Sequence, residues 1–311
     1  MAGISVIVPV YNGARHLPAL LDAFEAQTQD PAQVEYIIVN NKSRDRTSEI
    51  ASSYAKTAKI NLTCIDENDI QGSYAARNKG IHTSRGEFLL FTDADCVPHP
   101  DWIKNIIQGF ENPNVGAVAG TILPYPGTTL LEEFAAHAGI LSHVHSLNHA
   151  YMPFAQTANV AFRRDVFRKT GLFRSGLRTG GDADLNWRMQ KTTGYKLIHQ
   201  ENAVILHRHR RSFRDLYEQF ERYGRAAVYL DDMHGWKAPR ELDFPYSFYQ
   251  LVTWLFFKYP VLLTKYHAAS IPRVEVYLEP LTLYIKLCSA IGTAKARQLE
   301  RVNDLSIEYL S

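Results

Sequence analysis

An alternation of short apolar runs with helical patterns over the first third of the chain restricts the possible folds most. Ile4–Val10 is a nearly continuous apolar run, which predicts a strand buried on both faces of a parallel sheet. Apolar residues at helical spacing follow it, from Leu17 to Phe24. Two more strands are expected at Glu35–Val39 and Asn61–Ile65, with a second helix between them. This alternation predicts an α/β fold with a Rossmann-like, doubly wound and mostly parallel sheet.

A fourth predicted strand, at 87–92, runs directly into Asp93 and Asp95. Two carboxylates separated by one residue point the same way from an extended backbone. Hard divalent cations such as Mg²⁺ and Mn²⁺ take oxygen ligands and often bridge phosphates. Doubly wound sheets bind ligands beyond the carboxyl ends of their strands, where Asn40 and Asn41 also fall. The sequence therefore predicts a metal and diphosphate site at this edge of the sheet.

Two later segments carry further candidate groups. Asp182 lies in a Gly-Gly turn, where the backbone can approach a substrate closely, and Asp184 is expected to be the N-cap of the helix that follows. One of the two is a general base, or both only cap the helix. A predicted strand at 203–206 ends at His207, which either binds a metal such as Mn²⁺ or makes a local hydrogen bond.

The chain resembles the family 2 glycosyltransferases with the GT-A fold. The matching strings occur in order over roughly residues 4 to 225: VIVPVYNGARHLPALLDAF, VNNKSRDRT, QGSYAARNKGI, FTDAD, TANVAFRRDVFRKTGLF and GGDADLNWR. The resemblance implies metal-dependent, inverting transfer from a nucleotide-sugar. In such a reaction a carboxylate takes the proton of the acceptor hydroxyl and a cation stabilises the leaving diphosphate. The Q-x-x-R-W motif of processive synthases is absent, which favours transfer of one sugar to a lipid-linked or glycan acceptor.

By this resemblance Asp182 is the catalytic base, and Asp95 and His207 bind Mn²⁺ or Mg²⁺. The residues expected to contact the nucleotide or the sugars are Pro9, Tyr11, Asn40, Asn41, Arg77, Asp93, Asn159 and Asp184. Two positions depart from the family pattern. Asn40 and Asn41 replace an acidic pair, which removes charge from the base pocket, and Gly181 replaces the glutamate before the catalytic aspartate. The second departure leaves the choice of base between Asp182 and Asp184 open.

A group of histidines falls where the family has its acceptor side: His137, His143, His145 and His149. The spacing of the last two would place them on one helix face and permits a metal site. Partly exposed histidines facing the acceptor are the favoured interpretation.

The composition changes after residue 235. We expect a catalytic domain at 1–235, with its donor half at about 1–100 and its acceptor half at about 101–235, and a helical tail at 236–311. Two aromatic and aliphatic stretches of the tail, 246–267 and 277–293, are interrupted by charge and proline and are too broken to span a bilayer. They are expected to lie on a membrane surface, or alternatively to form a helical subdomain packed on protein.

Composition restricts the remaining possibilities. A formal net charge of +2 gives no indication of nucleic-acid binding, and three scattered cysteines suit a reducing cytoplasm. The chain enters its first strand without a basic leader, so a cytoplasmic protein is expected, peripheral on the inner face of the cell membrane if the tail binds lipid. Three alternatives stay open. They are a retaining transferase without a base at Asp182, a nucleotidyltransferase, which would carry a Gly-rich basic loop after the first strand, and a non-catalytic protein that binds sugar nucleotides.

Overall fold

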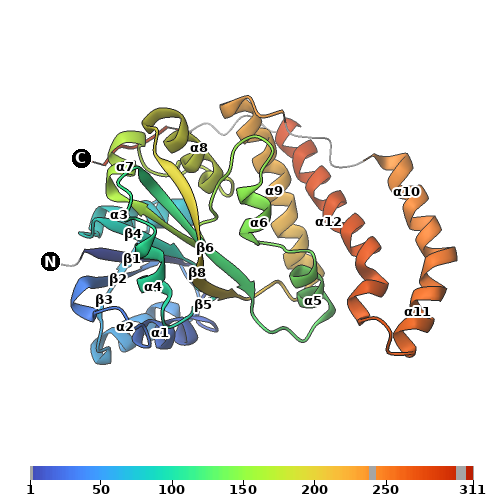
Figure 1. Ribbon diagram of the computed structural model, residues 1–311, viewed down its shortest axis with the longest axis horizontal. Coiled ribbons are helices and arrows are strands. Elements are labelled where there is room, and N and C mark those ends of the chain that lie inside the picture. Colours follow the sequence, from blue (N-terminus) through green and yellow to red (C-terminus); the bar gives the residue numbers. More distant parts are fainter. Residues whose placement is uncertain (1–2, 238–242, 299–305, 311) are drawn as a thin grey trace. The chain divides into compact units, whose positions relative to one another are not determined.

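The computed structural model describes residues 3–237, 243–298 and 306–310 (Figure 1). The strands are β1 (Ile4–Val10), β2 (Val34–Asn40), β3 (Asn61–Asp66), β4 (Phe88–Thr92), β5 (Cys96–Pro98), β6 (Val115–Pro124), β7 (Asn159–Arg163) and β8 (Lys196–His207). The helices up to residue 208 are α1 (Leu17–Glu25), the 3₁₀ turn η1 (Pro31–Gln33), α2 (Thr47–Thr57), α3 (Ser73–Thr83), α4 (Trp102–Gln108), α5 (Leu130–His137), α6 (His143–Leu147), α7 (Arg164–Thr170) and α8 (Gly181–Thr193). Those that follow are α9 (Phe213–His234), α10 (Phe244–Thr253), the π-helical η2 (Trp254–Lys258), α11 (Tyr259–His267) and α12 (Arg273–Gln298).

The strands form one eight-stranded sheet in the order β3-β2-β1-β4-β7-β6-β8-β5. β3, β2, β1 and β4 pair in parallel, which confirms the predicted α/β start of the chain. β7 is inserted antiparallel between β4 and β6, β6 runs parallel to β8, and β5 pairs antiparallel with the end of β8. The result is a mixed sheet in which the parallel strands carry their carboxyl ends to one edge.

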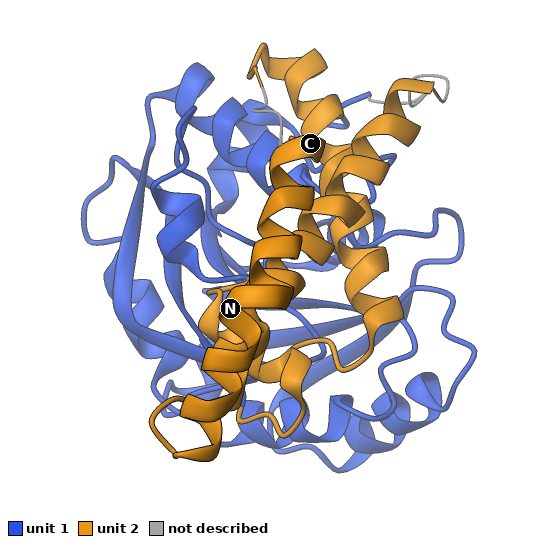
Figure 2. Ribbon diagram, turned by 90° about the vertical axis from the view of Figure 1, so that its right-hand side faces the viewer, with its two compact units in different colours: residues 1–125, 141–208, 302–311 blue, residues 126–140, 209–301 orange. Residues whose placement is uncertain are grey.

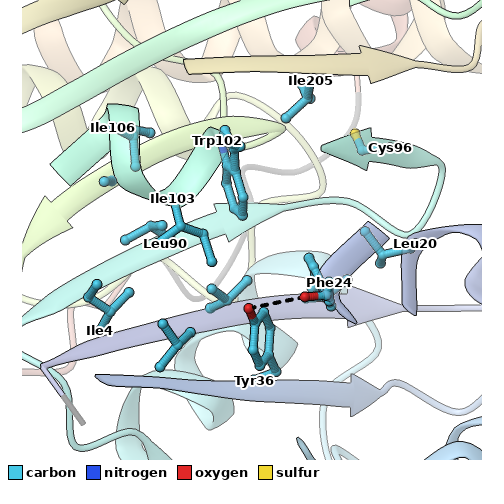
Figure 3. Close-up of a cluster of buried hydrophobic side chains, with 14 of the residues drawn as sticks. Ile4, Leu20, Phe24, Tyr36, Leu90, Cys96, Trp102, Ile103, Ile106 and Ile205 are labelled. Atoms are coloured by element: carbon cyan, nitrogen blue, oxygen red, sulfur yellow. Dashed lines mark hydrogen bonds between the residues drawn. The ribbon is translucent and has the colours of Figure 1, made fainter. Parts of the chain in front are cut away.

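The first strand shows why the sheet is buried on both faces. Val6, Val8 and Val10 belong to one apolar core together with residues of α1 and α4. Figure 3 shows part of this core, including Leu20 and Phe24 of α1 and Trp102 of α4. The intervening Ile7 faces α3, where a Cβ on Gly80 would lie 2.4 Å from the Ile7 side chain. Alternating side chains thus serve two layers of helices, as expected of a central strand in a doubly wound sheet.

The core between the sheet, α1 and α4 is built around aromatic side chains. Tyr36 of β2 and Phe24 of α1 have ring centroids 4.7 Å apart, and the Tyr36 hydroxyl donates to the Phe24 carbonyl oxygen at 3.5 Å, drawn as a dashed line in Figure 3. Trp102, the first residue of α4, is fully buried. These contacts hold the strands whose ends carry the polar groups described below.

The chain divides into two compact units, coloured separately in Figure 2. Unit 1 comprises 1–125, 141–208 and 302–311 and contains the whole sheet; unit 2 comprises 126–140 and 209–301. α9 belongs to unit 2, so the predicted boundary at residue 235 does not coincide with this division. The domain boundary at residue 235 and the division into a donor half and an acceptor half stay predictions. Residues 238–242, 299–305 and 311 of the predicted tail lie outside the described residues.

The two apolar stretches of the predicted tail differ in how far their side chains are buried. α12 packs on α9 at backbone distance, because a Cβ on Gly224 would lie 1.9 Å from the Ser289 carbonyl oxygen. Its side chains Val274 and Leu281 join an apolar cluster with α5 and α9. The alternative of packing on protein thus describes the second stretch, whereas the first, α10 to α11, contributes no buried side chain. Within the described ranges, no helix combines the length and the apolar character needed to cross a membrane.

Candidate active site

The turn between β4 and β5 carries Asp93 and Asp95, as predicted, and an arginine anchors the first of them. Arg77 points inward from α3 and is 3 % exposed. Its Nη2 donates to Asp93 Oδ1 at 2.6 Å. A buried guanidinium with a carboxylate partner is favourable only where the geometry is good, so Arg77 fixes the Asp93 side chain in place. The structure therefore brings together two residues predicted to face the donor.

Asp95 and His207 meet because β5 pairs with the end of β8. Cys96 lies opposite His207 in that pairing, and the Asp95 carbonyl oxygen accepts from the Arg208 N–H at 3.1 Å. Asp95 Oδ1 lies 3.4 Å from His207 Nε2, and the ligand atoms of Asp95, Cys96 and His207 all fall within 4.8 Å of one another. Among the described residues these three form a candidate metal-binding group, of which the sequence analysis named two.

The donor atoms suit a hard or borderline cation. Burial raises the pKa of the Cys96 thiol, and the neighbouring Asp95 and Asp93 carboxylates raise it further. Sulfur is a soft donor, which hard cations such as Mg²⁺ and Mn²⁺ do not prefer. That leaves one carboxylate oxygen and one imidazole nitrogen, a pair that fits Mn²⁺ and, less well, Mg²⁺. The residues present thus fit the expected ion.

Asp182 is the second residue of α8, which begins after Gly180 in the left-handed conformation, φ 82°. The residue as a whole is half-buried. Burial raises the pKa of Asp182, against the opposing effects of the Arg77 guanidinium and of the Ala183 N–H that donates to it at 3.1 Å. A carboxylate of raised pKa on a partly exposed residue has the properties of a general base.

Asp184 has a different environment, and its predicted N-cap position is wrong. The helix begins at Gly181, so Asp184 lies inside the first turn and its own N–H donates to the Gly180 carbonyl oxygen at 3.0 Å. Its carboxylate is fully buried and accepts from Arg174 Nε at 3.2 Å and from Arg188 Nε at 3.0 Å. With both oxygens held by arginines, Asp184 is placed to stabilise the fold, and this geometry does not support the expected substrate contact.

Asn159 is also fully buried. Its amide nitrogen donates to the carbonyl oxygens of Thr121 and Ala203, each at 2.9 Å, and its oxygen accepts from Trp102 Nε1 at 2.7 Å. These bonds join β6, β7, β8 and α4. A sugar contact by Asn159 would require breaking them, so the geometry supports a structural position.

The residues expected around the nucleotide base separate into an outer and an inner set. Tyr11 follows Val10, the last residue of β1, and so lies two residues after Pro9; its side chain is 53 % exposed. Asn40 donates to Asp66 Oδ1 at 2.7 Å, which brings the ends of β2 and β3 together and adds an exposed carboxylate that the sequence analysis missed. Asp66 ends a predicted strand, and that position was the available signal.

Asn41 belongs to the inner set. It is 2 % exposed, donates to the carbonyl oxygens of Glu67 and Ile70 at 3.0 and 2.8 Å, and accepts from the Gly72 N–H at 2.7 Å. Its amide therefore organises the loop that leads into α3, the helix that carries Arg77. The predicted pair at 40 and 41 thus divides into one residue at the surface and one in the interior.

The predicted histidine group does not form a common helix face. α6 ends at Leu147, before His149, so the expected pairing of His145 with His149 on one face is wrong. His143 is buried instead of partly exposed; its Nε2 accepts from the Gln156 N–H at 2.8 Å and its Nδ1 lies 2.5 Å from the Gly120 carbonyl oxygen. It is a neutral core histidine, because Nδ1 must carry the proton.

Comparison with known proteins connects this geometry with a family. The sequence model of Glycosyl transferase family 2 matches residues 5–171. Glycosyltransferase AglE of Haloferax volcanii is 34 % identical over 228 residues, which cover 72 % of this chain and 73 % of that protein. The chain belongs to glycosyltransferase family 2. It is a glycosyltransferase, and the resemblance inferred from the six ordered strings is confirmed.

Two further proteins are similar to this chain at lower identity. The glucosyl-dolichyl phosphate glucuronosyltransferase of Haloferax volcanii is 26 % identical over 229 residues, covering 66 % of this chain and 69 % of that protein. The structure of the mannosyltransferase PcManGT from Pyrobaculum calidifontis, in complex with GDP-Man and Mn²⁺, aligns with a TM-score of 0.66 at 20 % identity over 94 % of this chain and 87 % of that one. The predicted GT-A fold with additional C-terminal helices is confirmed.

Proposed function

We propose that the protein transfers one sugar from a nucleotide-sugar to a lipid-linked acceptor, with inversion and with a divalent cation. The observation that carries the proposal is the cluster around Arg77. This arginine is paired with Asp93 of the metal turn and acts electrostatically on Asp182, so a candidate base and a candidate diphosphate site belong to one charge network. The known relatives with sugar-nucleotide donors or lipid-phosphate acceptors support the same assignment.

In this reaction Asp182 accepts the proton of the acceptor hydroxyl. The hydroxyl oxygen forms a bond to the anomeric carbon as the bond from that carbon to the diphosphate oxygen breaks, and the electron pair leaves with the diphosphate. Mn²⁺ or Mg²⁺ held by Asp95 and His207 would neutralise the charge that develops on this leaving group. Arg77 keeps Asp93 directed at the donor, and Tyr11 and Asn40 offer a stacking surface and an amide for the base.

Asp182→Asn tests the base. Turnover should fall by about 10²- to 10⁴-fold, the usual scale for loss of a general base, while the binding of the nucleoside diphosphate stays unchanged. Asp165→Asn is the matched control, because Asp165 pairs with Lys169 and Tyr195 and lies outside the cluster. Transfer with a panel of nucleotide-sugars in the presence of Mn²⁺ gives the readout. Full turnover in Asp182→Asn would contradict the assignment, and nucleotide binding without any transfer would favour a non-catalytic protein.

The segment 244–267, which we call the aromatic arm, supports the lipid-linked acceptor. It comprises α10, η2 and α11 in direct succession. Its large side chains lie open to solvent, with exposed fractions up to 71 %: Phe244, Tyr246, Phe248, Tyr249, Leu251, Leu255, Phe256, Phe257, Val261 and Tyr266. Aromatic residues with flanking lysines are typical of segments that lie in the headgroup region of a bilayer. The protein would then act at the inner face of the cell membrane.

Two side chains of the arm bond to α12. Trp254 Nε1 donates to the Val276 carbonyl oxygen at 3.0 Å, and Lys258 pairs with Glu279 at 2.6 Å. A helical segment that is bonded to the rest of its unit and exposes aromatic side chains is suited to peripheral binding at a membrane surface.

Vesicle flotation decides this point. Wild-type protein should float with phosphatidylglycerol vesicles, and Phe256→Ser with Phe257→Ser should reduce the bound fraction severalfold. Val144→Ser, which changes an apolar side chain 64 % exposed on α6, is the control and should float like the wild type. A wild-type protein that ignores vesicles would refute membrane contact and leave the transferase assignment intact.

A further inference from the structure

Tyr74, in the first turn of α3, lies against the candidate base. It is 4 % exposed. Its ring stacks on Phe173, with centroids 5.4 Å apart and planes inclined by 19°, and the Arg77 guanidinium lies 5.4 Å from the ring centroid. A phenol packed in this way has one fixed orientation, so the position of its oxygen is determined by the core and not by solvent.

The Tyr74 hydroxyl joins two consecutive residues of α8. Its oxygen accepts from the Gly181 N–H at 2.9 Å, and it donates to Asp182 Oδ1 at 3.3 Å. Burial raises the pKa of Tyr74 well above its ordinary value, so the phenol keeps its proton throughout the range in which an enzyme works. With its acceptor site used by Gly181, the hydroxyl is a donor toward the carboxylate of Asp182.

Gly181 is required by the ring and not by its backbone conformation. It is the first residue of α8 and is not among the positive-φ glycines of the described chain. A Cβ there would lie 2.8 Å from two ring carbons of Tyr74, closer than real side chains approach. The glutamate that the family pattern has at position 181 therefore could not be accommodated while Tyr74 keeps its place.

We propose that Tyr74 is a positioning residue for the base, and that the pair Tyr74–Gly181 replaces the glutamate found before the catalytic aspartate in the family pattern. This inference rests on the proposed function, because it assumes that Asp182 is the base. The phenol holds Asp182 Oδ1 and favours its ionised form, which is the form that accepts a proton. Of the titratable groups, Tyr74 and Arg77, both of α3, act on this carboxylate, and both stabilise the charge.

Tyr74→Phe tests the proposal, because it keeps the stacked ring and removes only the hydroxyl. Without this hydrogen bond the pKa of Asp182 should rise, so the acid limb of the pH profile of kcat should move to higher pH by about one unit. At a given pH on that limb, kcat should then be about 10-fold lower. The KM for the donor should not change. Tyr36→Phe, a buried phenol in the core that bonds only to a backbone carbonyl, is the control and should keep the wild-type profile.

Two double variants show whether the effect passes through the base and the ring. In the Asp182→Asn background, Tyr74→Phe should cost nothing further. Gly181→Ala should lower kcat at least 10-fold in the wild type, and much less in the Tyr74→Ala background, where the ring that it meets is absent. Equal losses in both backgrounds would overturn the role of the ring, and an unshifted pH profile in a normally folded Tyr74→Phe would overturn the positioning role.

The two proposals fail separately. If Asp182→Asn keeps full turnover, the base assignment is wrong whatever Tyr74 does. If Asp182→Asn loses turnover while the Tyr74→Phe profile superimposes on that of the wild type, only the role of Tyr74 is refuted.

Discussion

The Asp184 carboxylate is enclosed between two arginines, and its removal is a perturbation whose size follows from the contacts. In Asp184→Ala, Arg188 keeps a buried guanidinium, 8 % exposed, that has lost its counter-charge. Removing one partner of a buried ion pair typically costs about 3–5 kcal/mol. Arg188 still donates to the carbonyl oxygens of Thr170, Gly171 and Leu172, so we expect the lower end of this range.

Urea unfolding measures this loss. With a slope of about 2–3 kcal/mol/M, a loss of about 3 kcal/mol lowers the midpoint by about 1–1.5 M. Asp165→Asn is the matched control: its ion pair with Lys169 is between exposed side chains, so its loss should cost less than about 1 kcal/mol. Asp184→Ala combined with Arg188→Ala should recover part of the loss, because the buried Arg188 guanidinium is removed together with its counter-charge.

The same experiment distinguishes the two aspartates of the α8 turn. Asp184→Ala should lower stability, and at a temperature where the variant is folded it should retain most of the turnover. Asp182→Asn should lose turnover without any loss of stability. If Asp184→Ala unfolds at the wild-type midpoint and has lost turnover, the reasoning from burial and arginine pairing is refuted, and Asp184 is the chemically active residue.

Three further predictions concern metal and pH. Asp95→Asn should weaken Mn²⁺ binding in the presence of a nucleoside diphosphate by more than about 10-fold in calorimetry, and unchanged binding would refute the ligand assignment. Burial lowers the pKa of His143 from 6.5 to about 4, so the unfolded state takes up a proton first and stability falls as the pH drops from 6.5 to 4. This residue alone should account for about 3 kcal/mol of that fall. The difference in unfolding free energy between the wild type and His143→Asn should therefore shrink by this amount between pH 6.5 and pH 4. A difference that stays constant with pH would contradict the lowered pKa of His143. Because the folded pKa of Asp182 is raised, its ionised form costs stability at neutral pH, so Asp182→Asn should melt higher than the wild type at pH 7, with the gain disappearing in acid. A lower melting temperature at pH 7 would contradict the effect of burial.

Much of the fold and part of the site follow from local sequence. β1, β2 and β4 were predictable because continuous apolar runs of strand length bury both faces, as their observed positions in the sheet confirm. Asp93 and Asp95 could be found because their position depends only on where one such strand ends. The same reasoning identified His207 at the end of β8.

The rest depends on contacts between distant segments, which a local pattern does not contain. Tyr74 meets Asp182 across 108 positions of the chain, and nothing around residue 74 distinguishes this tyrosine from an ordinary core aromatic. Cys96 joins the metal group only through the register of β5 against β8. Asn159 was predicted to contact a sugar because it lies in a string that matches the family, whereas here its amide bonds to neighbouring strands.

The three-residue turn that carries Asp93 and Asp95 also restricts the curvature of the sheet. β4 and β5 are joined directly in the chain, yet β7, β6 and β8 lie between them in the sheet. In a flat sheet four strand spacings separate them by about 19 Å, whereas the chain from Thr92 to Cys96 reaches at most about 14 Å. The sheet must therefore curl until its edge strand approaches β4, and this turn is the shortest covalent tie across the curl. Each residue inserted there would let the sheet open and carry His207 and Asp95 away from Asp93, so the length of this turn is a geometric requirement of the active site.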